Sequence, residues 1–172
     1  MISDTPGYVA QMTGIPTRKR YMAATEFVDQ ATRYTYTHLQ YSTTAEETLT
    51  AKVKFEEHLQ SFGVPVTGYH ADNGIFAANE CRRHCELRGQ RLTFAGVGAH
   101  HQNGIAERKI RELQDLSRAM LIHSKTKWPG AITDNLWPYA VRMAGEIINN
   151  SPVFQTDKSP LQMLSSSTIN IN

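Results

Sequence analysis

Two acidic residues, Asp72 and Glu107, have the types and placement that metal-assisted chemistry requires, and they lie 107 − 72 = 35 positions apart. Asp72 begins an Asp-Asn-Gly turn after a strand-like segment, and Glu107 falls in the first turn of an expected helix. Carboxylates that converge from separate elements can hold divalent cations such as Mg²⁺. Two-metal sites catalyse in-line attack on phosphodiesters, so the pattern indicates chemistry on nucleic acid.

Each of these residues also has a purely structural explanation. Asp-Asn-Gly is a common turn sequence, and the helix dipole favours glutamate in the first turn of a helix. Asn103 and Gly104, which precede Glu107, have the residue types of an ordinary helix cap. The local patterns alone leave both explanations open.

The elements that would position these acids begin with a β-hairpin. Residues 20–28 and 33–41 are rich in Thr, Tyr, Phe and Val, which is typical of paired strands. A capping-box pattern from Thr44 to Glu47 then predicts the start of a helix. Apolar residues spaced four, four and three apart are expected to face the core from this helix: Ala51, Phe55, Leu59 and Phe62.

Strands and helices alternate in the rest of the chain. Residues 64–71 and 91–95 predict strands, and a short helix between them is marked by Ala78, Cys81 and Cys85. Cys81 and Cys85 lie near histidines, but structural zinc ligands are paired more closely, so we expect both cysteines to be core residues.

A glycine-rich loop at residues 96–104 is expected to be mobile. The helix after it should run from about residue 102 or 103 to about 123, with Glu107 at the edge of its buried face. Its buried face should contain Ala106, Ile110, Leu113, Ser117 and Met120. A last helix over residues 136–149 is expected to bury Leu136, Ala140, Met143 and Ile147.

This order of elements predicts an α/β fold with a mixed sheet flanked by helices. Residues 1–19 lack periodicity and are interrupted by proline and glycine, which predicts an irregular N-terminal segment. The folded domain is expected to span residues 20–164, followed by a polar tail at 165–172. A further helical turn is expected between Lys158 and Leu164.

The composition agrees with one folded domain. The chain has 172 residues, 40% hydrophobic residues and a net charge of +2. No apolar run approaches the roughly 20 residues needed to cross a bilayer, so no membrane partner is expected. Two cysteines are too few for a disulfide framework, which favours an intracellular setting.

Four blocks of the chain match one family in their order. They are residues 21–33 (YMAATEFVDQATR), Asp72-Asn73-Gly74, residues 102–109 (QNGIAERK) and the segment 136–152. They resemble the catalytic core of copia-type retrotransposon integrases, which are ribonuclease H-like DNA strand transferases. The resemblance covers roughly residues 20–164, and QNGIAERK is its most specific block.

The resemblance implies DNA integration by two-metal phosphodiester strand transfer. It makes Asp72 and Glu107 catalytic residues and ligands of Mg²⁺ or Mn²⁺. It also implies retroelement ends and target duplex as partners, a homo-oligomer, and action in the nucleus. The residues expected to contact nucleic acid are Asn103, Gly104, Arg108, Lys109 and Arg111. The same cations also suit ordinary pairing along a helix surface.

The chain departs from the family in two places. The family's spacing between the second and third acids is one residue longer, and its first catalytic aspartate lies on a strand upstream of Tyr21. Nothing strand-like precedes Asp4, so we expect a core that is N-terminally truncated, lacks the first strand and begins just after the missing aspartate. Such a core should be weakly active or inactive.

Two other functions remain open. A non-catalytic, nucleic-acid-binding remnant of a transposable element would need no complete set of acids. A different ribonuclease H-like nuclease would cut DNA without joining it.

Overall fold

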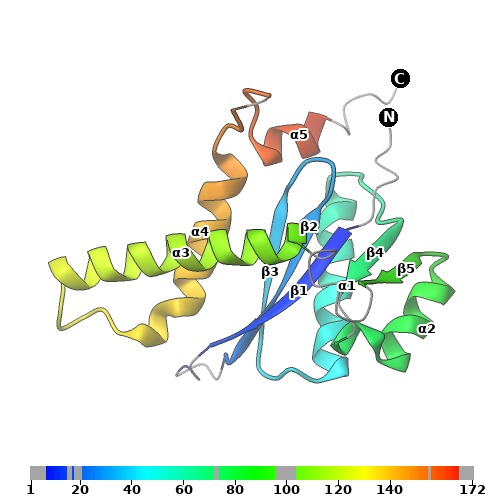
Figure 1. Cartoon of the computed structure of the whole chain (residues 1–172), viewed down its shortest axis with the longest axis horizontal. Helices are drawn as coiled ribbons and strands as arrows, with labels where there is room; N and C mark the ends of the chain where they lie inside the picture. Colours follow the sequence, from blue (N-terminus) through cyan, green and yellow to red (C-terminus); the bar gives the residue numbers. More distant parts are fainter. Residues whose placement is uncertain are drawn as a thin grey trace.

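The computed structural model describes residues 7–14, 17, 21–71, 74–95, 104–154 and 156–166. A five-stranded sheet lies at its centre, with α1 and α2 on one face and α3 and α4 on the other (Figure 1). The strands are β1 Gly7–Thr13, β2 Ala23–Asp29, β3 Thr35–Gln40, β4 Gly68–Ala71 and β5 Arg91–Phe94. The helices are α1 Ala45–Ser61, α2 Asn79–Leu87, α3 Gly104–Lys127, α4 Trp137–Asn150 and α5 Pro160–Ser166, with 3₁₀ turns at Ile75–Ala77 and Asp134–Leu136.

The sheet is mixed, as predicted, and its strand order is β3-β2-β1-β4-β5. The middle strand, β1, pairs antiparallel with β2 and parallel with β4, so that Val9 lies opposite Phe27 on one side and beside Ala71 on the other. The remaining pairs are β2 with β3, which is antiparallel, and β4 with β5, which is parallel. None of the described helices has the length and apolar character needed to cross a bilayer.

The prediction that residues 1–19 are irregular is wrong for Gly7–Thr13, which form the middle strand. The expectation that the sheet has no strand before the hairpin is wrong for the same reason. Pro6, Gly14 and Pro16 flank this apolar segment and do not interrupt it. Its backbone groups bond to a strand on each side, and this non-local pairing outweighs the local turn signals.

The domain therefore extends beyond its predicted bounds at both ends. β1 lies before residue 20, and α5 includes two residues, 165 and 166, of the predicted polar tail.

The hairpin and the first helix form where the sequence predicts them. The N-cap of α1 is Thr44, whose Oγ1 accepts a hydrogen bond from the backbone N–H of Glu47 at 3.4 Å. The C-cap of the helix is Phe62, and Gly63 follows with φ +73°, a conformation that favours glycine.

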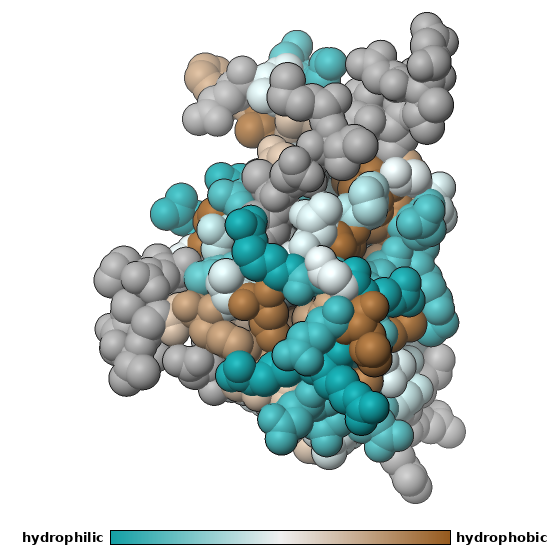
Figure 2. Space-filling model, turned by 90° about the vertical axis from the view of Figure 1, so that its right-hand side faces the viewer, coloured by the Kyte–Doolittle hydropathy of each residue, from teal (hydrophilic) through white to brown (hydrophobic). Residues whose placement is uncertain are grey.

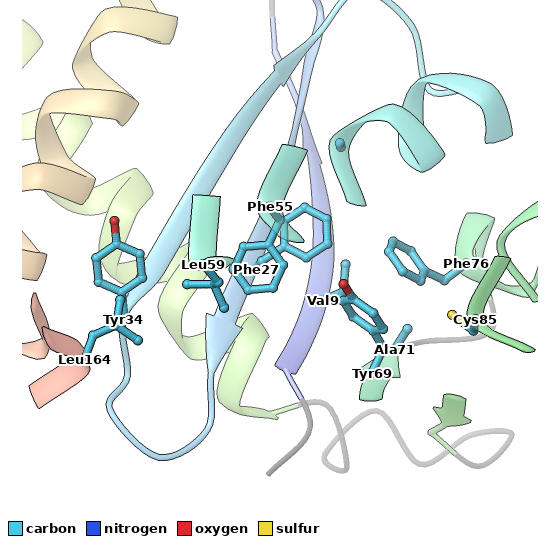
Figure 3. Packing of buried hydrophobic residues seen from close by; sticks show 11 residues of the cluster. Val9, Phe27, Tyr34, Phe55, Leu59, Tyr69, Ala71, Phe76, Cys85 and Leu164 are labelled. Atoms are coloured by element: carbon cyan, nitrogen blue, oxygen red, sulfur yellow. The ribbon is translucent and has the colours of Figure 1, made fainter. Parts of the chain in front are cut away.

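Aromatic side chains fill the core between the sheet and α1 (Figure 3). Phe27 of β2 stacks on Phe55 of α1 with ring centroids 4.6 Å apart. Tyr69 of β4 and Phe76 meet Phe27 edge-on at 6.3 and 6.1 Å. Offset and edge-on contacts of this kind stabilise a core beyond the area that they bury.

A buried lysine joins α1 to α2 and to the segment before β5. The side chain of Lys52 is fully buried, and its Nζ donates hydrogen bonds to Glu56 Oε1 at 2.5 Å and to Gln90 Oε1 at 2.7 Å. It also lies 2.9 Å from Nδ1 of His84, and because an ammonium group can only donate, the imidazole nitrogen accepts. Burial, followed by the charge of Lys52, lowers the pKa of His84. The network is saturated, as a buried charge requires.

The two cysteines lie beside this network on α2. Cys81 and Cys85 are buried and unbridged, as expected of core residues. Desolvation is the largest cause that raises the pKa of both thiols, to about 11 for Cys81. The outer side of this helix is hydrophilic, with smaller hydrophobic patches nearby (Figure 2).

The predicted buried face of α4 is wrong for two of its four residues. Met143 is 56% exposed and Ile147 is 37% exposed. The helix instead turns its small residues toward the sheet and α3. A Cβ on Gly145 would lie 3.6 Å from Oγ1 of Thr37 and 3.8 Å from Leu113. Small residues allow a closer approach than the larger side chains of the predicted stripe. The buried residues of α4 are Pro138, Ala140, Val141, Ala144, Gly145, Ile148 and Asn149.

One carboxyl group is buried on this face of the sheet. Glu26 of β2 is fully buried between Ala10 of β1 and Thr37 of β3. Its Oε2 accepts a hydrogen bond from Thr37 Oγ1 at 2.9 Å, whereas Oε1 has no hydrogen-bond partner among the described residues. Desolvation raises the pKa of Glu26 to about 8, against the opposing effect of the Thr37 bond.

This carboxyl group should make the stability depend on pH. Between pH 4.5 and about 8 the unfolded chain has lost the proton that the folded chain keeps, so stability falls as pH rises. Each pH unit in that interval should remove up to about 1.4 kcal/mol. Urea unfolding between pH 4 and 9 measures this slope. Glu26→Gln should flatten it, and Glu86→Gln on the exposed side of α2 should not. An unchanged slope in Glu26→Gln would contradict the assignment.

Asn149 of α4 covers part of the edge of the sheet. Its Oδ1 accepts a hydrogen bond from the backbone N–H of Thr35 at 2.9 Å, and its Nδ2 donates to the Thr35 carbonyl at 2.7 Å. β3 is an edge strand, so these backbone groups have no partner strand on that side. The side-chain amide thereby makes the pair of backbone hydrogen bonds that a neighbouring strand would otherwise make with Thr35.

Asn149→Ala should destabilise the fold by about 1–3 kcal/mol, because it leaves two buried backbone groups of Thr35 without partners. Chemical denaturation measures the loss. Asn150→Ala is the matched control, since that exposed side chain bonds only to Glu146 of its own helix among the described residues. Equal stability of the two variants would show that the edge contact contributes little.

Candidate functional site

Helix α3 crosses β1 and β2 with its first turn toward β4 (Figure 1). Ala106 and Leu113 are fully buried against the sheet and α4, which fixes the rotation of the helix. Glu107 is exposed in the first turn, at the edge of the buried face, where the sequence predicts it. A carboxylate at such a boundary can reach both a metal ion and solvent.

The predicted site residues fall into two groups. The structure places Glu107 on α3 together with Gly104, Arg108, Lys109 and Arg111. Asp72 and Asn103 lie outside the described residues.

The end of β4 indicates which part of the middle strand lies beside the site. β4 ends at Ala71, which pairs with Val9 of β1, and Asp72 is the next residue in the sequence. The next residue along β1 is Ala10, and the strand sequence GYVAQMT contains no carboxylate. The described residues contain no group of three or more His, Cys, Asp or Glu residues that could hold a metal ion.

Two aromatic side chains that the sequence analysis did not single out as site residues lie next to the end of β4. Tyr8 of β1 and His70 of β4 are register partners, and their rings meet edge-on at 5.2 Å. Nδ1 of His70 lies 2.9 Å from Oγ1 of Thr93 on β5. The signal in the sequence is the position of His70, two residues before Asp72.

The cations of α3 differ in their surroundings. Lys109 is only 14% exposed, and its Nζ donates to Glu112 Oε2 at 2.6 Å. Arg108 and Arg111 are exposed. Arg111 lies one turn after Glu107 on the same side of the helix, since residues four apart are neighbours. Arg111 therefore presents a positive charge on the same side of the helix as Glu107.

Similar proteins were found by sequence and by structure, although no family model matches the chain. The Pro-Pol polyprotein of feline foamy virus is 26% identical over 158 residues, which are 91% of this chain and 12% of the polyprotein. The chain thus spans only a small part of that relative.

Solved structures match most of the chain. The catalytic core domain of BIV integrase has a TM-score of 0.69 at 17% identity, with 96% of both chains covered. The chain has the fold of an integrase catalytic core. The HTLV-2 integrase core in complex with magnesium gives 0.67 at 16% identity and covers 94% of this chain and 97% of its own. An integrase core fold of the ribonuclease H-like type confirms the predicted class of fold.

One chain of a larger assembly also matches this chain in structure. The simian T-cell lymphotropic virus intasome, solved in complex with the PP2A regulatory subunit B56 gamma, has a TM-score of 0.73 at 20% identity. The match covers 94% of this chain and 54% of the intasome chain. The integrase core fold of this protein therefore corresponds to part of a longer polypeptide in that assembly.

Proposed function

We propose that this chain is the catalytic core of a retroelement integrase of the copia type, which joins DNA ends to a target duplex by strand transfer. The observation that supports this most is the match along nearly the whole length of two separate integrase cores, with Glu107 at the start of the helix that crosses the middle strand. The QNGIAERK block adds the copia-type assignment.

The proposed metal ligands are the carboxylates of Asp72 and Glu107. Carboxylate oxygens are the donors that Mg²⁺ and Mn²⁺ prefer, and one of the matched integrase cores was solved with magnesium. Bound divalent ions would supply activation of an attacking hydroxyl and stabilisation of the leaving oxygen. The protein's own contribution is to present Glu107 from the first turn of α3 and to orient the DNA through Arg108 and Arg111.

We propose that strand transfer by this chain is weak, because β1 offers no carboxylate beside the end of β4. One charge pair about 4 Å apart at an effective dielectric constant of 20 is worth ~4 kcal/mol. A loss of that size corresponds to roughly a thousandfold in rate. Asp29, the acid at the end of β2, does not fill the gap, because its Oδ2 accepts hydrogen bonds from Thr32 within the hairpin turn.

The proposed partners follow from the same function. DNA ends and target duplex are the substrates, a homo-oligomer is the working form, and the nucleus is the place of action. Support for an oligomer comes from the HTLV-2 core, which was solved in trimeric and dimeric forms, and from the intasome.

A second candidate is a nucleic-acid-binding remnant without catalysis. The absence of an acid on β1 favours it. The DNA binding of such a remnant would be insensitive to Mg²⁺ and to Asp72→Asn. An active core would instead lose its metal-dependent DNA contacts when Mg²⁺ is removed or Asp72 is replaced.

Mn²⁺ binding tests the proposed ligand. Glu107→Gln should weaken Mn²⁺ binding at least tenfold, because it removes one of two charged oxygen donors. Titration followed by electron paramagnetic resonance measures the free ion. Glu112→Gln, on the same helix and paired with Lys109, is the matched control and should bind as the parent chain does. Equal affinities of the parent and Glu107→Gln would remove Glu107 from the site.

The missing acid suggests a gain-of-function test. Ala10→Asp should raise Mn²⁺ affinity at least tenfold and increase strand transfer, because Ala10 is the next residue on β1 beyond the end of β4. Thr13→Asp places the same charge at the exposed end of the strand and should change neither. An assay with pre-cut DNA ends and a target duplex measures joining. A folded Ala10→Asp variant with unchanged metal affinity would contradict the proposed geometry.

A further inference from the structure

A cavity of about 440 Å³ lies between the end of β1, the second half of α3 and the start of α4. Its size falls within the range of about 300–1,000 Å³ that is typical of small-ligand sites. Met12, Val141 and Trp137 provide apolar surface from the sheet and α4, and Leu121 adds to it from α3. The cavity lies well beyond Glu107 along the same helix, so it is separate from the candidate active site.

Trp137 is held in position at this cavity by close packing. A Cβ on Gly14 would lie 2.5 Å from Cε2 of the indole, so the backbone at the end of β1 lies directly against the ring. Trp137 also packs against Met12 and Val141. A fixed aromatic ring in the wall of a cavity favours a flat, apolar occupant.

The rim of the cavity carries positive charge. Arg118 and Lys125 line it from α3, and both are exposed. Lys125 lies 3.6 Å from Asp134, which also lines the cavity, but both side chains are more than half exposed and such pairs are weak. Within the described part of the chain, Arg118 has neither an ion-pair nor a hydrogen-bond partner. A cation without a partner next to an apolar wall suits a ligand with an anion beside a flat group.

The cations continue toward the candidate active site. Arg111, Arg118 and Lys125 are seven residues apart and therefore follow one side of α3, with a drift of only about 20° at each step. Glu107 begins the same row. It lies eleven residues before Arg118, or about 16 Å along the helix axis. At about 3.4 Å per nucleotide of a duplex strand, this distance equals roughly five nucleotides.

We propose that this cavity is a nucleobase subsite, in which an unpaired base packs on Trp137 while a neighbouring phosphate contacts Arg118. The proposal rests on the proposed function, which supplies DNA as the ligand. A nucleic acid fits better than an acidic peptide, because its charges repeat along the strand as the cations repeat along α3. Stacking of bases on aromatic rings and contacts of phosphates with cations are the contacts by which proteins bind single-stranded nucleic acid without sequence preference.

Trp137 is itself the reporter for this subsite. The chain has two tryptophans, and Trp128→Phe leaves Trp137 as the only one. We expect oligo(dT) to quench its emission saturably. An abasic oligonucleotide of the same length carries the same phosphates without bases, and it should bind at least about fivefold more weakly without quenching. Fluorescence anisotropy of labelled oligonucleotides measures binding independently of the tryptophan.

The phosphate contact is tested in the same background. Arg118→Glu should weaken oligo(dT) binding at least tenfold and reduce its dependence on salt. Arg83→Glu is the matched control, because Arg83 is exposed on α2 at the other face of the sheet, and it should bind within twofold of the parent. Both variants keep the candidate metal ligands.

The outcomes separate the subsite from the proposed function. If both oligonucleotides bind equally and Trp137 emission stays unchanged, the subsite is wrong and DNA binding stands. If neither binds at low salt, the proposed function fails and the subsite fails with it. Stronger quenching by an aromatic carboxylate than by oligo(dT) would also overturn the proposal, since the cavity would then prefer a small organic anion.

Discussion

The structure depends on the pairing of β1 at the centre of the sheet. Its backbone bonds to β2 on one side and to β4 on the other, and these two bridges hold the hairpin and the parallel strands in one sheet. The register of these pairs then determines which side chains lie next to one another around the candidate site. It places Val9 in the aromatic core, sets Ala10 opposite Glu26, and brings Tyr8 beside His70. A shift by one residue would exchange these faces.

The two faces of the sheet are stabilised in different ways. Toward α1, large aromatic side chains interlock, and the saturated Lys52 network joins the helix to α2. Toward α3 and α4, packing depends on small residues, as at Gly145, and this face holds the buried carboxyl group of Glu26, whose pKa burial raises to about 8. The face toward α3 and α4 is also the one that carries Glu107 and the cavity at Trp137.

Sequence patterns predicted those parts of the fold that depend on local signals. The hairpin, the N-cap at Thr44 and the exposed first-turn position of Glu107 follow from residue types and periodicity, and the structure has them. β1 was missed because its stability comes from two distant partner strands. The buried face of α4 was wrong because apolar size suggested Met143, whereas close approach selected Gly145. The cavity is lined by three segments that are far apart in the sequence, so no local sequence pattern predicts it.

The contact between Gly14 and Trp137 has an evolutionary consequence. Any side chain at position 14 would collide with the indole, so the two positions cannot drift independently. A descendant that replaces the indole by a smaller group would release position 14 from glycine, and one that changes Gly14 first would have to displace the indole. Covariation between these two positions among related sequences would record how long the end of β1 and the start of α4 have constrained each other.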